Sequence, residues 1–210
     1  MKWPGWAVAV VSALLLAACS EEDTVSPNYE MQYVDVLTDA SGRGTELLTD
    51  GGEHLPVLNP FDGLKADTVY RYVVYLVRQD EGVRIAAYGA VVSGVPASFE
   101  DMAVKTDSVK MQSIWRGADY INMTLQVLHR DKRHAYAFAD RGITSDSSGR
   151  KMLHIQLYHD AGGDFPAFSY TCYLSCSLQP YVGRLQAGRD SVSLVVNEYK
   201  KGPTVYRLPF

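Results

Sequence analysis

Turn-rich pieces divide the second half of the chain into short segments, and this division limits what the chain can fold into. In the segment 168–178, apolar and polar residues alternate, and a period of two is typical of a β-strand with one buried face. No long amphipathic helix separates the segments. The pattern predicts an antiparallel β-sandwich over residues 106–210. The strand segments are 109–115, 120–129, 134–139, 152–159, 168–178, 191–199 and 204–208.

Two cysteines, Cys172 and Cys176, lie on the apolar side of the alternating segment. Four residues along a strand span about 13 Å, whereas a disulfide needs Cα atoms within about 7 Å. We therefore expect both thiols to be free and to pack in the core as small apolar groups.

The first half of the chain predicts a small closed β-barrel within residues 33–105. Its strongest signal is a hairpin, in which the Tyr- and Val-rich segment 68–78 is joined to 83–92 by a polar turn. Both faces of 68–78 are apolar, as expected for a strand that packs on the barrel interior and on a neighbour. At the junction, residues 97–103 predict one short helical turn capped by Ser98.

The N-terminal segment has the features of a secretory signal. Lys2 precedes an apolar run, 6–18, that is too short to span a bilayer. The run ends in Leu16-Ala17-Ala18-Cys19, which resembles the lipobox of bacterial lipoproteins, where a peptidase cuts before the Cys and the thiol is acylated. This resemblance implies that residues 1–18 are removed and that acyl chains on Cys19 anchor the protein in a membrane.

Residues 19–32 are expected to form an acidic tether. Its first part, Ser20, Glu21, Glu22 and Asp23, resembles the export signal that follows the lipidated Cys in surface lipoproteins of one Gram-negative phylum. That resemblance implies a lipid-anchored protein of the outer membrane, exposed at the cell surface. The alternative interpretation is a hydrated spacer, which any acidic run beside a membrane could provide.

Three stretches of the second half resemble the C-terminal half of NigD-like lipoproteins. They are 113–123 (SIWRGADYINM), 154–160 (HIQLYHD) and the Ser-rich strand that contains Cys176, in the same order as in that family. The family places a small OB-like barrel behind a lipidated signal peptide and a β-sandwich behind the barrel. The resemblance therefore implies an all-β chain of this architecture, and a role in bacteriocin immunity.

Charge and motif content exclude several classes of function. The chain carries 20 basic and 24 acidic residues, and the densest basic cluster, 130–134, is interrupted by Asp131, whereas a nucleic-acid binder normally has a basic stripe. The sequence contains no nucleophile elbow, zinc-protease motif or phosphate-binding glycine loop. We therefore expect no nucleic-acid partner, no catalytic residues and no cofactor.

Two histidines and a glycine-rich turn are the candidates for metal binding in the sequence. His129 and His134 flank a four-residue turn and would meet across a hairpin, but the sequence offers only Asp131 as a nearby carboxylate, which makes a poor zinc site. Asp160 and Asp164 bracket two glycines, a pattern more typical of an ordinary turn than of a calcium loop. The sequence interpretation is therefore that no metal is bound.

Tyrosine is the one residue in excess, with 14 copies. Its large flat face and polar edge suit the binding of sugars and proteins, although strands favour aromatic residues in any case. The best candidates for a binding surface are Tyr70, Tyr72 and Tyr88 on the barrel. Two hypotheses follow: a non-enzymatic envelope lipoprotein that binds a protein partner, as in bacteriocin immunity, or an accessory lipoprotein that contacts a glycan through the barrel aromatics.

The proposed lipobox gives a first testable prediction. Replacing Cys19 with Ala removes the acylated thiol, so the protein should lose its membrane anchor. Replacing Glu21, Glu22 and Asp23 together with Ala should preserve lipidation and reduce surface exposure. Protease treatment of intact cells measures the second effect, and equal cleavage of the triple variant and the wild type would show that the acidic run is only a spacer.

Overall fold

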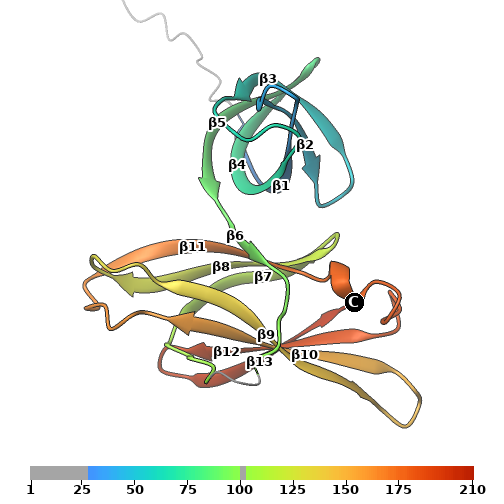
Figure 1. Cartoon of the computed structure of the whole chain (residues 1–210), viewed down its shortest axis with the longest axis vertical. Coiled ribbons are helices and arrows are strands. Elements are labelled where there is room, and N and C mark those ends of the chain that lie inside the picture. The colour runs from blue at the N-terminus through green and yellow to red at the C-terminus, as the bar shows by residue number, and fades with distance from the viewer. Residues whose placement is uncertain (1–27, 100–102) are drawn as a thin grey trace, which may run out of the picture.

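The computed structural model describes residues 28–99 and 103–210, which form a small barrel followed by a larger sandwich (Figure 1). Cys19 and the acidic run lie outside this range. Within it, no helix is long and apolar enough to cross a membrane. The barrel strands are β1 (Glu30–Thr38), β2 (Gly44–Thr49), β3 (His54–Phe61), β4 (Val69–Gln79) and β5 (Gly82–Ala90). The sandwich contains β6 (Val92–Gly94), β7 (Lys110–Gly117), β8 (Tyr120–His129), β9 (Ala135–Ser145), β10 (Lys151–Asp160), β11 (Phe168–Ser177), the 3-10 helix η1 (Gln179–Tyr181), β12 (Ser191–Glu198) and β13 (Gly202–Pro209).

The barrel closes in the order β1-β2-β3-β5-β4, and β4 pairs with β1. Alternate residues of its Val- and Leu-rich strands point inward, so that Val34, Leu47 and Leu76 are fully buried. Irregular pairing within β1–β2, β2–β3 and β4–β5 bends the strands around the core. At Gly44 a Cβ would lie 2.6 Å from Val36 Cγ1, so this close approach of strands requires glycine.

Strand β3 was not predicted, because its sequence carries two proline residues. Pro56 and Pro60 lack the backbone N–H that a strand uses in its ladder. The consequence is visible in the pairing: β3 contacts β5 in register only at Val57 and Val83. The β3–β5 side of the barrel is therefore held mainly by side-chain packing, because it lacks a continuous ladder of backbone hydrogen bonds.

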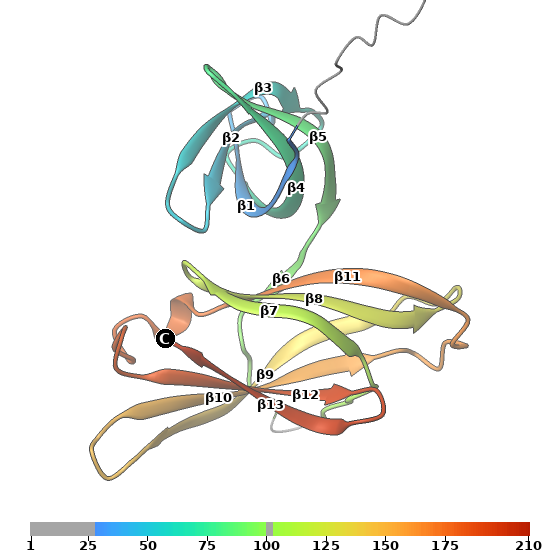
Figure 2. The ribbon, with the colours of Figure 1, turned by 180° about the vertical axis from the view of Figure 1, so that it is seen from behind.

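The sandwich consists of two four-stranded sheets, β13-β12-β10-β9 and β6-β11-β8-β7, which face each other (Figures 1 and 2). Both sheets contribute fully buried side chains to one core, among them Leu125, Leu174 and Leu194. The predicted fold class, an OB-like barrel before a β-sandwich, is confirmed. Two of the strand pairs, β10 with β12 and β6 with β11, are parallel, so the sandwich is mixed rather than purely antiparallel.

Strand β6 brings the chain into the sandwich ahead of residue 106, where the sequence placed the boundary. Only Val91 separates β5 of the barrel from β6, and β6 pairs with β11 at the edge of its sheet. The following segment then reaches the opposite sheet, since Ala97 forms a bridge with Ala139 and Thr106 forms one with His159. Residues 100–102 of the helical turn predicted after Ser98 lie outside the described residues, so that turn stays a prediction. Just before it, the N–H and C=O of Ala97 bond the backbone of β9.

The two cysteines of β11 are free and buried, as the strand spacing predicted. Cys172 and Cys176 both belong to the core between the sheets. The other face of β11 is not fully solvated, however. Ser175 is fully buried and Tyr173 packs beside Tyr33, because this face of the sheet lies against the barrel.

Arg71 of β4 connects the barrel to the sandwich. Its guanidinium bonds two barrel carboxylates, Asp35 Oδ1 at 3.3 Å and Asp50 Oδ1 at 2.6 Å, and its side chain is only 4% exposed. From the same group, Nη2 donates to Asn122 Oδ1 at 3.1 Å and Nε to Ser175 Oγ at 3.3 Å, both in the sandwich. Burial raises the pKa of Asp35, and the Arg71 charge counteracts that effect.

Aromatic residues enclose this buried network. The Tyr120 ring lies 4.0 Å from Arg71 Cζ, in cation–π geometry. Tyr33 donates its hydroxyl to the Met123 carbonyl at 2.9 Å and packs edge to face on Trp115 at 4.9 Å between centroids. Directional hydrogen bonds and aromatic packing therefore fix the barrel on the β7–β8–β11 face.

Replacing Arg71 with Ala tests this connection. The change leaves two carboxylates and the Asn122 amide without their cation in a buried place, so the free energy of unfolding should fall by about 3 kcal/mol. Arg43→Ala is a matched control, because the Arg43–Asp62 pair is exposed and such pairs contribute below about 1 kcal/mol. Urea unfolding followed by circular dichroism measures both, and equal losses would contradict the structural role of Arg71.

Candidate functional site

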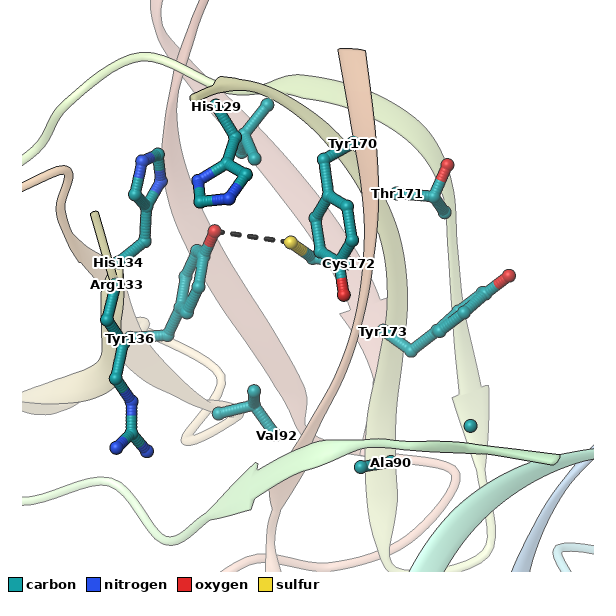
Figure 3. Close-up of a pocket in the computed structure, with 12 residues that line it drawn as sticks. Ala90, Val92, His129, Arg133, His134, Tyr136, Tyr170, Thr171, Cys172 and Tyr173 are labelled. Atoms are coloured by element: carbon teal, nitrogen blue, oxygen red, sulfur yellow. Dashed lines mark hydrogen bonds between the residues drawn. The ribbon is translucent and has the colours of Figure 1, made fainter. Parts of the chain in front are cut away.

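A cavity of about 400 Å³ opens beside the junction of the barrel and the sandwich (Figure 3). Its wall is formed by the end of β5, by β6, by strands β8 and β11 of one sheet, and by the start of β9 in the other. Aromatic and imidazole groups dominate its polar lining. The lining residues are Gly89, Ala90, Val92, Val127, His129, Arg133, His134, Tyr136, Tyr170, Thr171, Cys172 and Tyr173.

At the inner side of the cavity, Tyr136 and Cys172 contact each other. Their Oη and Sγ atoms are 3.2 Å apart (Figure 3). Burial raises the pKa of Tyr136, and the contact with Cys172 raises it further. Burial also raises the pKa of Cys172, more than the Tyr136 hydrogen bond lowers it. Both groups therefore keep their protons at neutral pH, and the thiol lacks the thiolate character that a nucleophile needs.

A cluster of two histidines and one aspartate lies at the rim of the cavity. Oδ2 of Asp164 is 3.0 Å from His129 Nδ1 and 3.3 Å from His134 Nε2. The Asp164 side chain is fully buried, whereas that of His129 is 35% exposed. The two imidazole rings meet edge to face at 5.4 Å between centroids. The sequence predicted that they meet across a hairpin, but β8 and β9 belong to different sheets, so the turn between them links the two sheets of the sandwich.

The turn between β8 and β9 holds the Asp164 carboxylate. Backbone N–H groups of Arg130, Asp131 and Lys132 all donate to it, at 2.8 to 3.3 Å. Burial alone would raise the pKa of Asp164, but the three N–H donors and His134 together lower it below its usual range. Asp164 is therefore a carboxylate at neutral pH.

A third histidine, His159 of β10, extends the cluster into the core. Its Nε2 lies 3.0 Å from His134 Nδ1, and its Nδ1 lies 2.9 Å from the Asp107 carbonyl oxygen. The Tyr136 ring stacks on His159 in parallel, at 4.8 Å between centroids. Burial lowers the pKa of His159, and the neighbouring His134 lowers it further despite the Asp107 hydrogen bond, so its neutral form is favoured.

The sequence did not reveal this cluster. The pair His129 and His134 was identified, but Asp164 was assigned to a turn with Asp160, which in fact bonds Lys105 and the Gly162 N–H. Asp164 is distant in sequence from the β8–β9 turn that it contacts, and it reaches that turn because β10 pairs with β9 and β11 with β8. No local motif could have given this contact.

The barrel tyrosines form a second candidate site. Tyr70 and Tyr72 pair across the ladder with the interior residues Val36 and Val34, so they share the interior face of β4 and pack, partly buried, against the barrel core. Tyr72 is at the centre of a group of rings: centroids of Tyr70, Tyr88 and Phe61 lie 6.1, 5.5 and 5.9 Å from it. Tyr88 is 59% exposed.

The three tyrosines expected from the sequence are therefore brought together, with Phe61 as a fourth ring. Phe61 belongs to β3, the strand that the sequence analysis missed, so its place in the group could not be inferred. Phe61 is buried and Tyr88 exposed, which gives the group an apolar base and an accessible edge. Such a surface can stack against a flat apolar face of a ligand.

Together, the closed barrel and the mixed sandwich define a two-domain β protein. The model of the NigD-like C-terminal β-sandwich domain matches residues 92–210, and the chain belongs to this family. The start of the match coincides with the first residue of β6. No curated protein sequence matches the chain.

Solved structures share the whole architecture. A NigD-like immunity protein from Bacteroides caccae is 23% identical, with a TM-score of 0.70 over 86% of this chain and 92% of its own. A protein of unknown function from Bacteroides vulgatus is 16% identical, with a TM-score of 0.63 over 86% and 91%. A protein from Bacteroides fragilis, described as a candidate lipoprotein, is 11% identical, with a TM-score of 0.62 over 88% and 98%. These likenesses establish the fold.

Proposed function

We propose that this protein is a lipid-anchored lipoprotein on the outer surface of the outer membrane, and that it confers bacteriocin immunity by binding rather than by catalysis. The lipobox at Cys19 supports the anchor, and the acidic run after it supports the surface location. Family membership supports the role, because a protein of the same fold is named as an immunity protein. The partner in this proposal is a protein toxin at the cell boundary.

The observation that carries the proposal is the preformed cavity at the junction. Its walls come from β5, β6, β8, β9 and β11, and the Arg71 network holds the barrel against the sandwich. A rigid concave surface with exposed aromatic residues such as Tyr170, 56% exposed, suits a protein side chain or loop. The proton-retaining Tyr136 and Cys172 support contact over chemistry.

A second candidate function is supported by the barrel aromatics. Tyr70, Tyr72 and Tyr88 with Phe61 offer stacked and edge-on rings on the barrel, and sugar rings bind such surfaces through their apolar faces. Under this alternative the protein is an accessory lipoprotein that contacts a glycan. The two functions use different faces of the chain, so one set of variants separates them.

Bacteriocin challenge tests the immunity role. A susceptible strain that expresses the wild type should survive a cognate bacteriocin, whereas the Cys19→Ala form should fail because it is not held at the membrane. Tyr170→Ala should lower the bacteriocin dose that the strain survives about tenfold, because it removes an aromatic residue from the proposed interface. Tyr29→Ala is the control, because Tyr29 is similarly exposed, at 54%, and lies outside the cavity. Survival no better than that of the empty strain, with the wild type at the membrane, would contradict the proposal.

Pull-down on insoluble polysaccharides tests the glycan role. The wild type should be retained on at least one of cellulose, starch or xylan, and Tyr72→Ala or Tyr88→Ala should weaken retention about tenfold, since stacking of one aromatic residue contributes about 1 kcal/mol or slightly more. Binding should not require the lipid on Cys19. Tyr170→Ala should leave it unchanged, and equal retention of all variants would dismiss the barrel site.

A further inference from the structure

Three potential metal ligands converge where the β8–β9 turn meets the β10–β11 loop. His129 Nδ1, His134 Nε2 and an oxygen of Asp164 all lie within 4.8 Å of one another. Two of the three separations are 3.0 and 3.3 Å. Ligand atoms about 2.0–2.2 Å from a tetrahedral zinc ion are separated by about 3.3 Å, so these distances match such a site.

When both histidines of the cluster are neutral, its hydrogen bonds lack one proton. The chain from the Asp107 carbonyl through His159 and His134 to Asp164 contains three polar contacts, at 2.9, 3.0 and 3.3 Å, and each needs one proton. A carbonyl and a carboxylate bring none, and two neutral imidazoles bring one each.

The missing proton falls at the outer end of the chain. His159 uses its proton on the Asp107 carbonyl, and His134 uses its own on His159, so a lone pair on His134 Nε2 faces the Asp164 carboxylate. That arrangement is repulsive unless a cation lies there. Either a proton or a metal ion at His134 Nε2 would remove this repulsion. A metal ion would in addition bond His129 Nδ1, since both nitrogens lie within 3.3 Å of the same Asp164 oxygen.

We propose that His129 Nδ1, His134 Nε2 and Asp164 Oδ2 bind a divalent transition metal of the zinc class. Two imidazoles and one carboxylate are a zinc donor set that leaves a fourth position for water or a ligand. His159 lies outside the ligand set and accepts a hydrogen bond from His134 Nδ1–H. This bond leaves the Nε2 lone pair of His134 free for the metal, as similar hydrogen bonds orient histidine ligands in zinc proteins.

The surroundings prepare the site. Three backbone N–H groups hold the Asp164 carboxylate in place, while the Lys132 ammonium is occupied by the carbonyls of Gly162 and Gly163. His129 is partly exposed and its ring faces that of His134 at the edge of the cavity (Figure 3). The metal would join the β8–β9 turn to the β10–β11 loop at this end of the sandwich, and its fourth position would be accessible from solvent.

Metal titration of the purified lipoprotein in detergent tests the proposal. After treatment with EDTA, Zn²⁺ should bind with one ion per chain in calorimetry, and Co²⁺ should give the visible absorption of a tetrahedral complex. His129→Ala and Asp164→Asn should each weaken binding about 100-fold, because each removes a ligand, and His159→Gln should weaken it about 10-fold through loss of outer support. Asn at 164 retains an oxygen for the backbone N–H groups.

The control is His154→Ala. His154 lies on the same strand as His159 but bonds Thr144 on the exposed face, so its replacement should leave the affinity and the cobalt spectrum unchanged. Circular dichroism confirms that each variant is folded, and His129, as the exposed ligand, is the variant least coupled to the core. No binding by the wild type, or equal binding by wild type, His129→Ala and Asp164→Asn, would overturn the metal site and leave a protonated hydrogen-bond cluster in its place.

Discussion

The buried guanidinium of Arg71 is the interaction on which the arrangement of this molecule depends. Taking a charge out of water is costly, and the cost is offset only if every donor finds a partner. Here the partners are divided between the two domains: carboxylates of Asp35 and Asp50 on the barrel, Asn122 and Ser175 on the sandwich. Because these bonds are directional, a barrel rotated or shifted on the sheet would leave a buried charge unsatisfied.

The network around Arg71 is so closely packed that larger side chains would not fit beside it. Asp50 lies directly against Gly117 of β7, where any Cβ would overlap the carboxylate, and Asn122 donates to Asp50 at 2.5 Å. The glycine thus lets a barrel loop approach the sheet closely enough for ion pairing. The junction cavity has walls from both domains, since they include the end of β5 and part of β11.

Sequence reasoning found what depends on local pattern. The alternation in β11 predicted that its cysteines are buried, and the apolar faces of β4 predicted a strand packed on both sides. It missed β3, because Pro56 and Pro60 are unusual in a strand. It also gave Arg71 no role, although an arginine among Tyr and Val residues of a strand indicates a buried ion pair. Neighbours across the fold were also out of reach: Asp164 joins His129 through strand pairing alone.

The candidate sites divide in the same way. Tyr70, Tyr72 and Tyr88 follow strand periodicity, so the sequence identified them, and the ladder placed them around Phe61. The cluster at Asp164 combines residues from both ends of the β8–β9 turn with one from the β10–β11 loop, and its hydrogen-bond order depends on the position of His159 in the core. A site of this kind is fixed by topology, which no spacing along the chain records.

Strand β6 has a consequence for any attempt to divide the protein. It is the edge strand of its sheet and covers part of β11, yet it precedes the residue at which a domain boundary would be drawn from sequence alone. A fragment that begins at residue 106 would expose unpaired N–H and C=O groups of β11 over Leu174 to Cys176. Open edges of this kind invite pairing between molecules, so aggregation of the shortened sandwich would reflect a missing edge protector rather than an unstable core.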